Sequence, residues 1–443
     1  MKSIGIWRMN GCIGGLEVSL IELARFLKTC QQDVTLYGKA GPLASMCERY
    51  DVAVAPDYEI LEHEHDILIW ADNFGTFAET RSLCDPCAIT NHMQKIDRKI
   101  ACMGGWAGWR NLMPWCDEVI VKSQHMEQWA KSISGKPVFA RQFPIDLQIW
   151  KRKPDRVQND PLVVGYVGRT EDKGIDDARR IAREAGCGEI RTVCNCIKWS
   201  RDAFDEIDIF IMCSKREGGI PRSIMEAMAL SLPVVCYASG GITELNPSVW
   251  LPETNRADAV AILGTFAQAQ QNRLDVGNEN RQKIERFDTR SRFEYMRHLD
   301  AWPSAIDLGC GKRPKPDHFG IDCRGDMAAD LVWDLEQGIP WPNNTVEYVY
   351  SSHFLEHVAD PEALLREIQR VCVKGAVVEM KFPLEMPDPA HKVIFHHDVW
   401  RSCFDAFEIR HWAVVPVTTT AIREDIKGQQ FTYDEARITC VVV

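Results

Sequence analysis

Residues 214–245 read SKREGGIPRSIMEAMALSLPVVCYASGGITEL and carry the strongest structural signal in this 443-residue chain. A polar run leads into Gly218 and Gly219, and a helical segment and an apolar strand follow. A second pair, Gly240 and Gly241, opens the next turn. Because each glycine loop feeds the start of a helix, its backbone N–H groups can face a phosphate. The segment predicts an anion site or, as the plainer alternative, an ordinary strand–turn–helix connection.

Two glutamates flank the first glycine loop. Glu217 precedes the loop, and Glu226 lies on the helix behind it. Carboxylates accept hydrogen bonds from hydroxyl groups, whereas the loop amides suit a diphosphate. This combination of groups favours a nucleotide sugar as the ligand.

The same residues resemble the donor-binding half of GT-B glycosyltransferases of the retaining, GT4-like kind. That family carries two glutamates with seven residues between them, whereas eight residues separate Glu217 from Glu226. The resemblance implies that Glu217 orients the donor sugar and that Glu226 binds the ribose of the nucleotide. It also implies that both glycine pairs line the donor and that no metal ion is required.

The N-terminus has a similar pattern. A short strand is expected over 2–7, and apolar residues recur at helical spacing over 16–28. The glycine-rich turn between them indicates a Rossmann-like unit, although it lacks the GxGxxG signature of a dinucleotide site. In GT4-like enzymes a loop with two glycines lies against the donor here, and Gly14 and Gly15 match it. A tight turn without a ligand is the alternative.

His92 directly follows a strand expected over 88–91. Open α/β sheets bind ligands at the carboxyl ends of their strands, and the GT4-like family often places a histidine here that faces the donor sugar. The resemblance makes His92 a candidate catalytic residue, with a purely structural histidine as the alternative. Farther along, Ser123 follows a strand expected over 118–122 and can cap the next helix.

Arg169 and Lys173 follow a continuous apolar strand over 162–168, which is typical of a parallel sheet covered on both faces. They match two cations that hold the donor diphosphate in the GT4-like family. A helix terminus contributes about 0.3–1 kcal/mol, whereas millimolar affinity already requires about 4 kcal/mol. We therefore expect charge-assisted bonds from both cations to supply the difference. Two solvated surface charges are the alternative.

The segment that begins with AIDLGCG (305–311) repeats the strand and glycine turn. Together with FGID (319–322), ADLVWDL (329–335) and SSHFLEHV (351–358), it resembles class I S-adenosylmethionine (SAM)-dependent methyltransferases of the small-molecule type. One departure is the turn VCVKGA before the strand expected over 375–383, where that family usually has Pro-Gly-Gly.

The methyltransferase resemblance implies a role for each motif residue. Gly309 and Gly311 would let the backbone approach the methionine part of SAM, and Asp307 would accept a hydrogen bond from its ammonium group. Asp322 would bind both ribose hydroxyls, and Asp334 would contact adenine. The base for a methyl acceptor stays open among five histidines: His353, His357, His391, His396 and His397.

Length predicts about three domains at roughly 150 residues each, and the motifs give an α/β fold with three Rossmann-like domains. We expect a GT-B acceptor-side lobe over 1–155, a nucleotide-sugar-binding lobe over 156–300 and the methyltransferase-like domain over 301–443. The net charge is −11, and the segment from residue 300 holds 14 basic against 23 acidic residues. Such an acidic module binds nucleic acid poorly by bulk electrostatics.

No apolar run approaches the roughly 20 residues of a membrane span, and the start does not read as a signal peptide. The 17 cysteines are an odd number and are scattered along the chain, which favours a reducing compartment. Together these features predict a cytoplasmic protein. Cys84-x-x-Cys87 and Cys194-x-Cys196 are isolated pairs without a second pair at zinc spacing, so we expect packed thiols there. Asp205 and Asp208 are expected to be solvated residues at a strand edge, because the GT-B architecture needs no metal ion.

The sequence therefore predicts a bifunctional enzyme that uses a UDP- or GDP-linked sugar and SAM. The acceptor would be a glycan, a protein or a hydroxymethylated DNA base, so nucleic acid enters only as an acceptor; phage-encoded modification fits such a compact fusion. Two alternatives remain: a methyltransferase whose glycosyltransferase-like half only docks the acceptor, and a non-catalytic scaffold. The sugar, the acceptor and the oligomeric state stay open.

Overall fold

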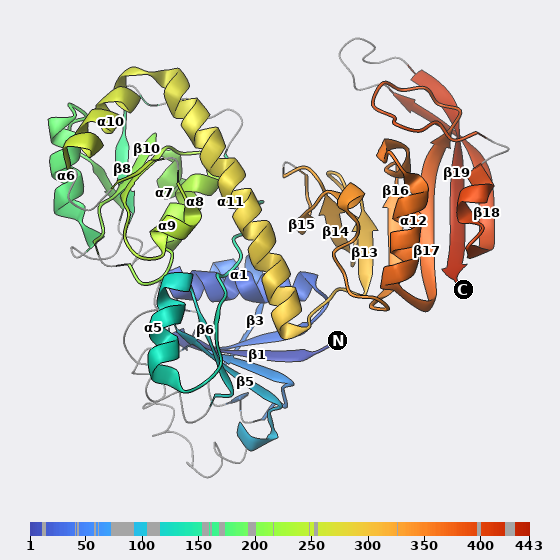
Figure 1. Ribbon diagram of the computed structural model, residues 1–443, viewed down its shortest axis with the longest axis horizontal. Helices are drawn as coiled ribbons and strands as arrows, with labels where there is room; N and C mark the ends of the chain where they lie inside the picture. Colours follow the sequence, from blue (N-terminus) through green and yellow to red (C-terminus); the bar gives the residue numbers. More distant parts are fainter. Residues whose placement is uncertain are drawn as a thin grey trace. The chain divides into compact units, whose positions relative to one another are not determined.

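Three sheets organise the chain in the computed structural model (Figure 1). The chain divides into two compact units, Met1–Lys28 with Gln32–Leu299, and Thr29–Gln31 with Asp300–Val443. The predicted α/β class is confirmed. The structure describes residues 1–10, 15–39, 41, 44–56, 59–60, 62–71, 93–103, 116–152, 159, 162–167, 173–193, 201–215, 217–247, 249–251, 256–325, 327–396, 400–420 and 430–443.

The first sheet has seven parallel strands in the order β3-β2-β1-β4-β5-β6-β7. Its strands are β1 (Ser3–Asn10), β2 (Asp33–Lys39), β3 (Ala53–Ala55), β4 (Ile67–Trp70), β5 (Arg98–Met103), β6 (Glu118–Val121) and β7 (Val138–Ala140). Helices α1 (Gly15–Thr29), α2 (Ala44–Arg49) and α5 (Gln124–Ser134) accompany it.

The elements expected at the N-terminus are present. Helix α1 buries the apolar residues Leu20, Leu23 and Leu27, which recur at helical spacing in the sequence. Ser123 caps α5 as predicted, because its side chain accepts a hydrogen bond from Met126 N at 3.0 Å.

The second sheet has five parallel strands in the order β12-β11-β10-β8-β9. Its strands are β8 (Val164–Val167), β9 (Arg191–Val193), β10 (Ile209–Met212), β11 (Val234–Tyr237) and β12 (Val249–Leu251). Its helices are α6 (Ile175–Glu184), α7 (Asp202–Asp205), α8 (Arg222–Ala229), α9 (Ile242–Leu245), α10 (Arg256–Gln268) and α11 (Gln270–Leu299).

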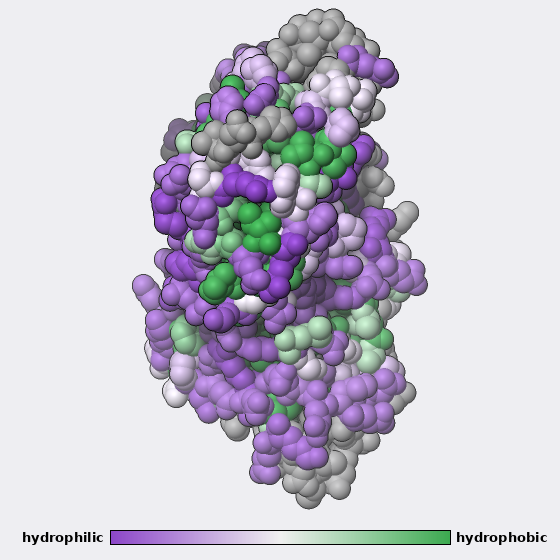
Figure 2. Space-filling view, turned by 90° about the vertical axis from the view of Figure 1, so that its right-hand side faces the viewer, coloured by the Kyte–Doolittle hydropathy of each residue, from purple (hydrophilic) through white to green (hydrophobic). Residues whose placement is uncertain are grey.

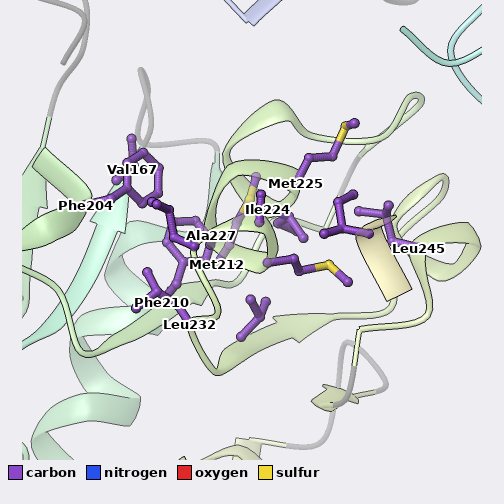
Figure 3. Packing of buried hydrophobic residues seen from close by; sticks show 14 of the residues in the cluster. Val167, Phe204, Phe210, Met212, Ile224, Met225, Ala227, Leu232 and Leu245 are labelled. Carbon is purple, nitrogen blue, oxygen red and sulfur yellow. The ribbon is translucent and has the colours of Figure 1, made fainter. Parts of the chain in front are cut away.

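A hydrophobic cluster fixes α8 against this sheet (Figure 3). Ile224 and Met228 of α8 are fully buried with Phe210 of β10 and Val234 of β11. Close packing of this kind leaves little room for α8 to shift. The loop before α8, which carries Glu217, therefore starts from a rigid base.

Helix α11 connects the two sheets of the first unit. Asn280 Nδ2 donates to Leu232 O at 3.0 Å in the second lobe. At its other end Tyr295 stacks on Phe143 with ring centroids 5.9 Å apart, and Arg98 Nη1 donates to His298 O at 2.6 Å. The lobes of this unit are thus joined by one continuous helix.

One prediction about the second sheet is wrong. Asp208, expected to be solvated, is buried before β10. Its Oδ2 accepts hydrogen bonds from Val163 N at 2.9 Å and from Asn159 Nδ2 at 2.9 Å. Strand β10 starts only at Ile209, and Asp205 ends α7. A buried carboxylate persists here because donors surround it.

The second unit contains a seven-stranded sheet in the order β15-β14-β13-β16-β17-β19-β18. Strands β17 and β18 pair antiparallel with β19, and the others pair in parallel. The strands are β13 (Ala305–Leu308), β14 (Phe319–Asp322), β15 (Leu331–Val332), β16 (Val346–Ser352), β17 (Cys372–Leu384), β18 (Phe407–Thr420) and β19 (Gln430–Val442). Helix α12 (Pro361–Val371) and the 3₁₀ turns η5 (Leu335–Gln337), η6 (Leu355–His357) and η7 (Trp400–Phe404) complete it.

The turn expected at VCVKGA is absent: Val371 ends α12, and the remaining residues belong to β17. The strand begins at Cys372 and continues through Gly375, which has φ +86°. The register between β16 and β17 shifts at Val346 and Tyr348. Glycine tolerates this left-handed conformation, so the segment forms an irregular strand instead of a turn.

The face drawn in Figure 2 is covered mainly by hydrophilic residues, and hydrophobic ones lie in small separate groups. Trp412 is one exposed large hydrophobic residue, and the guanidinium of Arg401 lies 3.8 Å from its ring centroid.

Among the described residues, no helix combines the length and the apolar character that crossing a bilayer requires.

Candidate functional site

The two glycine loops pack directly against one another. Gly240 has φ +50°, and a Cβ at this position would clash with the carbonyl oxygen of Glu217. A Cβ on Gly241 would lie 2.8 Å from Gly219 C and 2.9 Å from Ser123 Cβ. Only glycine permits this backbone approach. The sequence pairs 218–219 and 240–241 therefore form one structural feature beside the carboxyl end of β6.

Ser123 joins this feature to the first sheet. Its hydroxyl donates to Gly218 O at 2.6 Å while it caps α5. Gln124 N and His125 N, also at the start of α5, donate to the Glu244 carboxylate at 3.0 Å each. The N-terminal amides of α5 are thus already bonded to protein groups. Sequence reasoning gave Ser123 its capping role but missed this contact with the glycine loop.

Glu217 and Lys173 meet although 44 positions separate them. Glu217 Oε1 accepts from Lys173 Nζ at 2.5 Å and from Ser214 Oγ at 2.6 Å. Glu217 N donates to Ser239 Oγ at 3.0 Å. The glutamate is only 8% exposed, whereas the lysine side chain is 34% exposed. The structure therefore brings together the residues predicted to bind the sugar and the diphosphate.

Glu226 lies in a buried charged group shared by both lobes of the first unit. Arg222 Nε donates to Glu226 Oε1 at 3.0 Å, and Arg222 Nη2 lies 2.5 Å from Glu22 Oε1 of α1. Glu22 also accepts from Asp146 N at 2.7 Å and from Trp150 Nε1 at 3.1 Å. Two carboxylates thus share a single guanidinium.

This arrangement changes the acidity of its members. Burial raises the pKa of Glu226 to about 8, with Arg222 opposing and Glu22 adding to the effect. Burial opposes the charge of Arg222, but Glu22 and Glu226 raise its pKa above the usual value. Glu226 is 2% exposed and faces Arg222. Its predicted role as a ribose ligand stays a prediction.

The remaining predicted donor residues are placed unevenly. Gly15 starts α1, where an added Cβ would lie 3.1 Å from Arg222 Cβ. Gly14, His92 and Arg169 lie outside the described residues, as do the cysteine pairs 84/87 and 194/196. Sequence reasoning did not identify Arg222 as the residue that contacts Gly15 and both buried glutamates.

A polar cavity of about 120 Å³ lies beside the carboxyl ends of β6 and β7. Its walls carry both basic and acidic side chains, so it offers an anion no consistent attraction. Lys173 and Glu217 are not among its lining residues, which include Lys122, Arg141, Arg290, Glu127, Glu244 and Glu294.

In the second unit, the AIDLGCG motif forms β13 and the beginning of the turn that leads to β14. Gly309 has φ +68°, and a Cβ on it would clash with the ring of Phe354. Asp307 at the end of β13 accepts from Lys315 N at 2.8 Å and is 2% exposed. Burial raises the pKa of Asp307 to about 6, although the Lys315 hydrogen bond and charge oppose this effect. Sequence reasoning missed Phe354 and Lys315.

Asp322 supports the same turn from the next strand. Its Oδ2 accepts from Gly311 N at 3.0 Å, and its Oδ1 accepts from Arg324 N at 3.0 Å. Gly311 also has positive φ, at +58°. Asp334 instead caps η5 by accepting from Glu336 N at 3.0 Å. The structure thus brings Asp322 and Gly311 together, and it gives Asp334 a role in local structure.

Among the candidate bases, His353 has the most distinctive surroundings. It has φ +55°, and its Nε2 lies 2.7 Å from Glu435 Oε2 of β19. Its Nδ1 lies 3.6 Å from Glu356 Oε1. The nearby Glu356 carboxylate raises the pKa of His353, burial opposes the rise, and Glu435 adds to it. His397 lies outside the described residues.

Matches to family models cover both kinds of site. Residues 153–263 match the family described as glycosyl transferases group 1, and residues 274–379 match the model described as a methyltransferase domain. This chain joins a glycosyltransferase domain to a methyltransferase domain. The predicted resemblances to a glycosyltransferase and to a methyltransferase are thereby confirmed. The methyltransferase match begins within α11 of the glycosyltransferase unit.

A glycosyltransferase of amylovoran biosynthesis, AmsK from Erwinia amylovora, is 40% identical to this chain over 90 residues. The matched segment covers 18% of this chain and 22% of AmsK. This chain therefore matches less than a quarter of the length of that relative.

Solved structures support the GT-B fold of the glycosyltransferase domain. Anabaena HepE, solved in complex with UDP and glucose, has a TM-score of 0.54 at 15% identity and covers 68% of this chain and 100% of its own. The pneumococcal O-GlcNAc transferase GtfA, solved with UDP and GlcNAc, has a TM-score of 0.53 at 9% identity and covers 68% of this chain and 98% of its own. At these identities the likeness shows the fold.

Proposed function

We propose that the GT-B part of this chain transfers a sugar from a UDP-sugar to an acceptor with retention of configuration, as a GT4-like enzyme. The methyltransferase domain transfers a methyl group from SAM to the same acceptor or to another. UDP is favoured over GDP because HepE and GtfA were both solved with UDP. We assign residues 1–155 and 156–300 to the two GT-B lobes, and 301–443 to the methyltransferase domain.

The meeting of Lys173 with Glu217 beside the two glycine loops carries the proposal. An ammonium group has three donors, and Glu217 uses one of them. The other two remain able to bind diphosphate oxygens. The two glycine loops pack against each other and against the backbone of Glu217, and the amides of glycine loops that feed a helix favour anions.

The roles of the donor residues follow from this arrangement. Lys173, with Arg169, would stabilise the negative charge that develops on the leaving diphosphate, where electrostatic stabilisation has its largest effect. Glu217 would orient the sugar hydroxyls, and Glu226 would bind the ribose once Arg222 shares its hydrogen bonds. His92 would face the donor sugar.

SAM supplies an activated methyl group to the second domain. Gly309 and Gly311 would lie against its methionine part, with Asp307 accepting from the ammonium group. Asp322 would accept from the ribose hydroxyls, and Asp334 would contact adenine. The turn from β13 to β14 fits this ligand because Asp307, Asp322 and two glycines of positive φ converge there.

We expect Lys173→Ala to weaken UDP-sugar binding at least tenfold, because the cation that pairs with Glu217 beside the glycine loops is lost. Tenfold corresponds to about 1.4 kcal/mol. Isothermal titration calorimetry with UDP-glucose and UDP-GlcNAc measures the effect, and Arg169→Ala is expected to act alike.

Lys131→Ala provides the matched control, because Lys131 forms a more exposed Lys–Glu pair with Glu127 on α5. Its affinity for the nucleotide sugar is expected to equal that of the wild type. Unchanged affinity in both Lys173→Ala and Arg169→Ala would remove the assigned diphosphate site.

SAM affinity is expected to depend on pH through Asp307. Its carboxyl group has a raised pKa of about 6, and the SAM ammonium favours the ionised form. Affinity should therefore be constant near pH 7 and fall as pH drops below 6, by up to tenfold per pH unit. Calorimetry from pH 5 to 7.5 tests this. Asp307→Asn should bind SAM more weakly and without the pH dependence; a wild-type affinity that is flat over this range contradicts the assignment.

The methyltransferase whose other half only docks an acceptor remains a second candidate, because eight residues separate Glu217 from Glu226 where the family has seven. It predicts SAM binding without nucleotide-sugar binding. A scaffold predicts neither, so separate titrations with each ligand distinguish the three possibilities.

A further inference from the structure

Three side chains that can bind metals converge beside the end of β16. Glu356 and His357 lie on η6, and His391 comes from the segment that follows β17. One potential ligand atom from each side chain lies within 4.8 Å of those of the other two. Tetrahedral zinc ligands about 2.1 Å from the ion lie roughly 3.4 Å apart. A shift of about 1 Å in each side chain would therefore complete the ligand set.

Backbone carbonyls fix which nitrogen each histidine presents. His357 Nδ1 lies 2.9 Å from Ala390 O, and His391 Nδ1 lies 3.0 Å from Met386 O. A carbonyl only accepts, so Nδ1 must carry the proton when either bond is made. Nε2 then keeps its lone pair. Metal-binding histidines typically donate their second ring nitrogen in this way.

Glu356 provides an independent indication of a cation. It is 1% exposed, and its Oε1 lies 3.6 Å from His353 Nδ1. Within the part of the chain that the structure describes, Glu356 Oε2 has no hydrogen-bond partner. An ionised carboxylate oxygen buried without a donor is costly. A bound cation would remove this cost.

The backbone holds the two ligand segments together. Lys392 N and Val393 N donate to Glu356 O at 2.8 and 3.1 Å. His391 N donates to Asp388 O at 2.9 Å. These bonds attach the segment around His391 to η6 without using any of the three ligand side chains, so the set is ordered before an ion binds.

We propose that Glu356, His357 and His391 form a binding site for a divalent transition-metal ion of the Zn²⁺ type. Two imidazoles and one carboxylate suit Zn²⁺ and its neighbours in the series, whereas Mg²⁺ and Ca²⁺ prefer oxygen ligands. Three protein ligands leave at least one position for water or for an oxygen of a second molecule. This ion would be additional to the cofactors expected from the sequence.

Titration of the chelator-treated full-length chain with ZnCl₂ tests the site. We expect the chain to bind one Zn²⁺ ion, and we expect His357→Ala or His391→Ala to lower the Zn²⁺ affinity at least hundredfold. Mg²⁺ should show no comparable binding. His411→Ala is the control, because His411 is an exposed histidine on β18 of the same unit. The Co²⁺ spectrum should lack the charge-transfer band of thiolate ligands, which separates this site from the cysteines.

Glu356→Gln keeps the shape of the side chain and removes its charge, so it tests the site where an alanine variant fails to fold. We expect it also to weaken Zn²⁺ binding, with the thermal unfolding temperature in the presence of chelator close to that of the wild type. Equal Zn²⁺ affinity and stoichiometry in the wild type, the histidine variants and Glu356→Gln would overturn the proposal, as would a thiolate-type Co²⁺ spectrum.

Discussion

Replacement of Asp322 by alanine is expected to weaken SAM binding at least hundredfold while sugar transfer continues. Asp322 Oδ2 holds Gly311 N at 3.0 Å in the turn between β13 and β14. Alanine removes this bond and the carboxylate proposed to accept from the ribose hydroxyls. A hundredfold loss corresponds to about 2.8 kcal/mol, within the range for hydrogen bonds to a charged group.

Asp322→Asn separates the two contributions, because it keeps the size of the side chain and loses its charge. We expect intermediate affinity for SAM, measured by calorimetry, and wild-type release of sugar from the nucleotide donor. Loss of both activities in Asp322→Ala would contradict two independently working domains. Wild-type SAM affinity in that variant would contradict the proposed ribose contact.

Arg222→Met is expected to lower the free energy of unfolding of the GT-B unit by about 3–5 kcal/mol, the usual cost of leaving buried charges without their partner. Glu22 and Glu226 would both lose the guanidinium that they share, and the Arg222 link between α1 and α8 would be lost. Denaturant titration followed by tryptophan fluorescence measures the change.

Two further variants show how much of this loss of stability comes from the buried charge of Arg222. Arg222→Lys keeps a positive charge without the fork of donors and should be destabilised less than Arg222→Met. Arg366→Met removes an exposed cation that lies 3.8 Å from both Asp360 and Glu362, and exposed pairs contribute at most about 1 kcal/mol. A loss below about 1 kcal/mol in Arg222→Met would show that this buried group does not hold the lobes together.

Local features were predictable because the sequence expresses them within a few residues. The cap at Ser123, the buried face of α1 and the turn of AIDLGCG each follow from neighbouring side chains and backbone requirements. The two glycine pairs were also identified from local sequence. Their mutual contact was not, because it depends on how β6, α8 and α9 pack.

The rest depends on contacts between distant parts of the chain. Glu22 and Arg222 are 200 positions apart, so no spacing rule relates them. The burial of Asp208 could not be predicted, because its donors, Asn159 and Val163, precede it by more than forty residues. The proposed metal ligands also come from separate parts of the sequence. From the sequence, His357 and His391 were therefore each considered only as a candidate base.

Hydrolysis of a panel of nucleotide sugars by the full-length chain, without any acceptor, tests the central claim most directly. We predict slow release of free sugar from at least one UDP-sugar, strongly reduced in Lys173→Ala and unchanged in Asp322→Ala. If the folded chain binds SAM but neither binds nor hydrolyses any nucleotide sugar, the assignment of sugar transfer to the GT-B unit is contradicted.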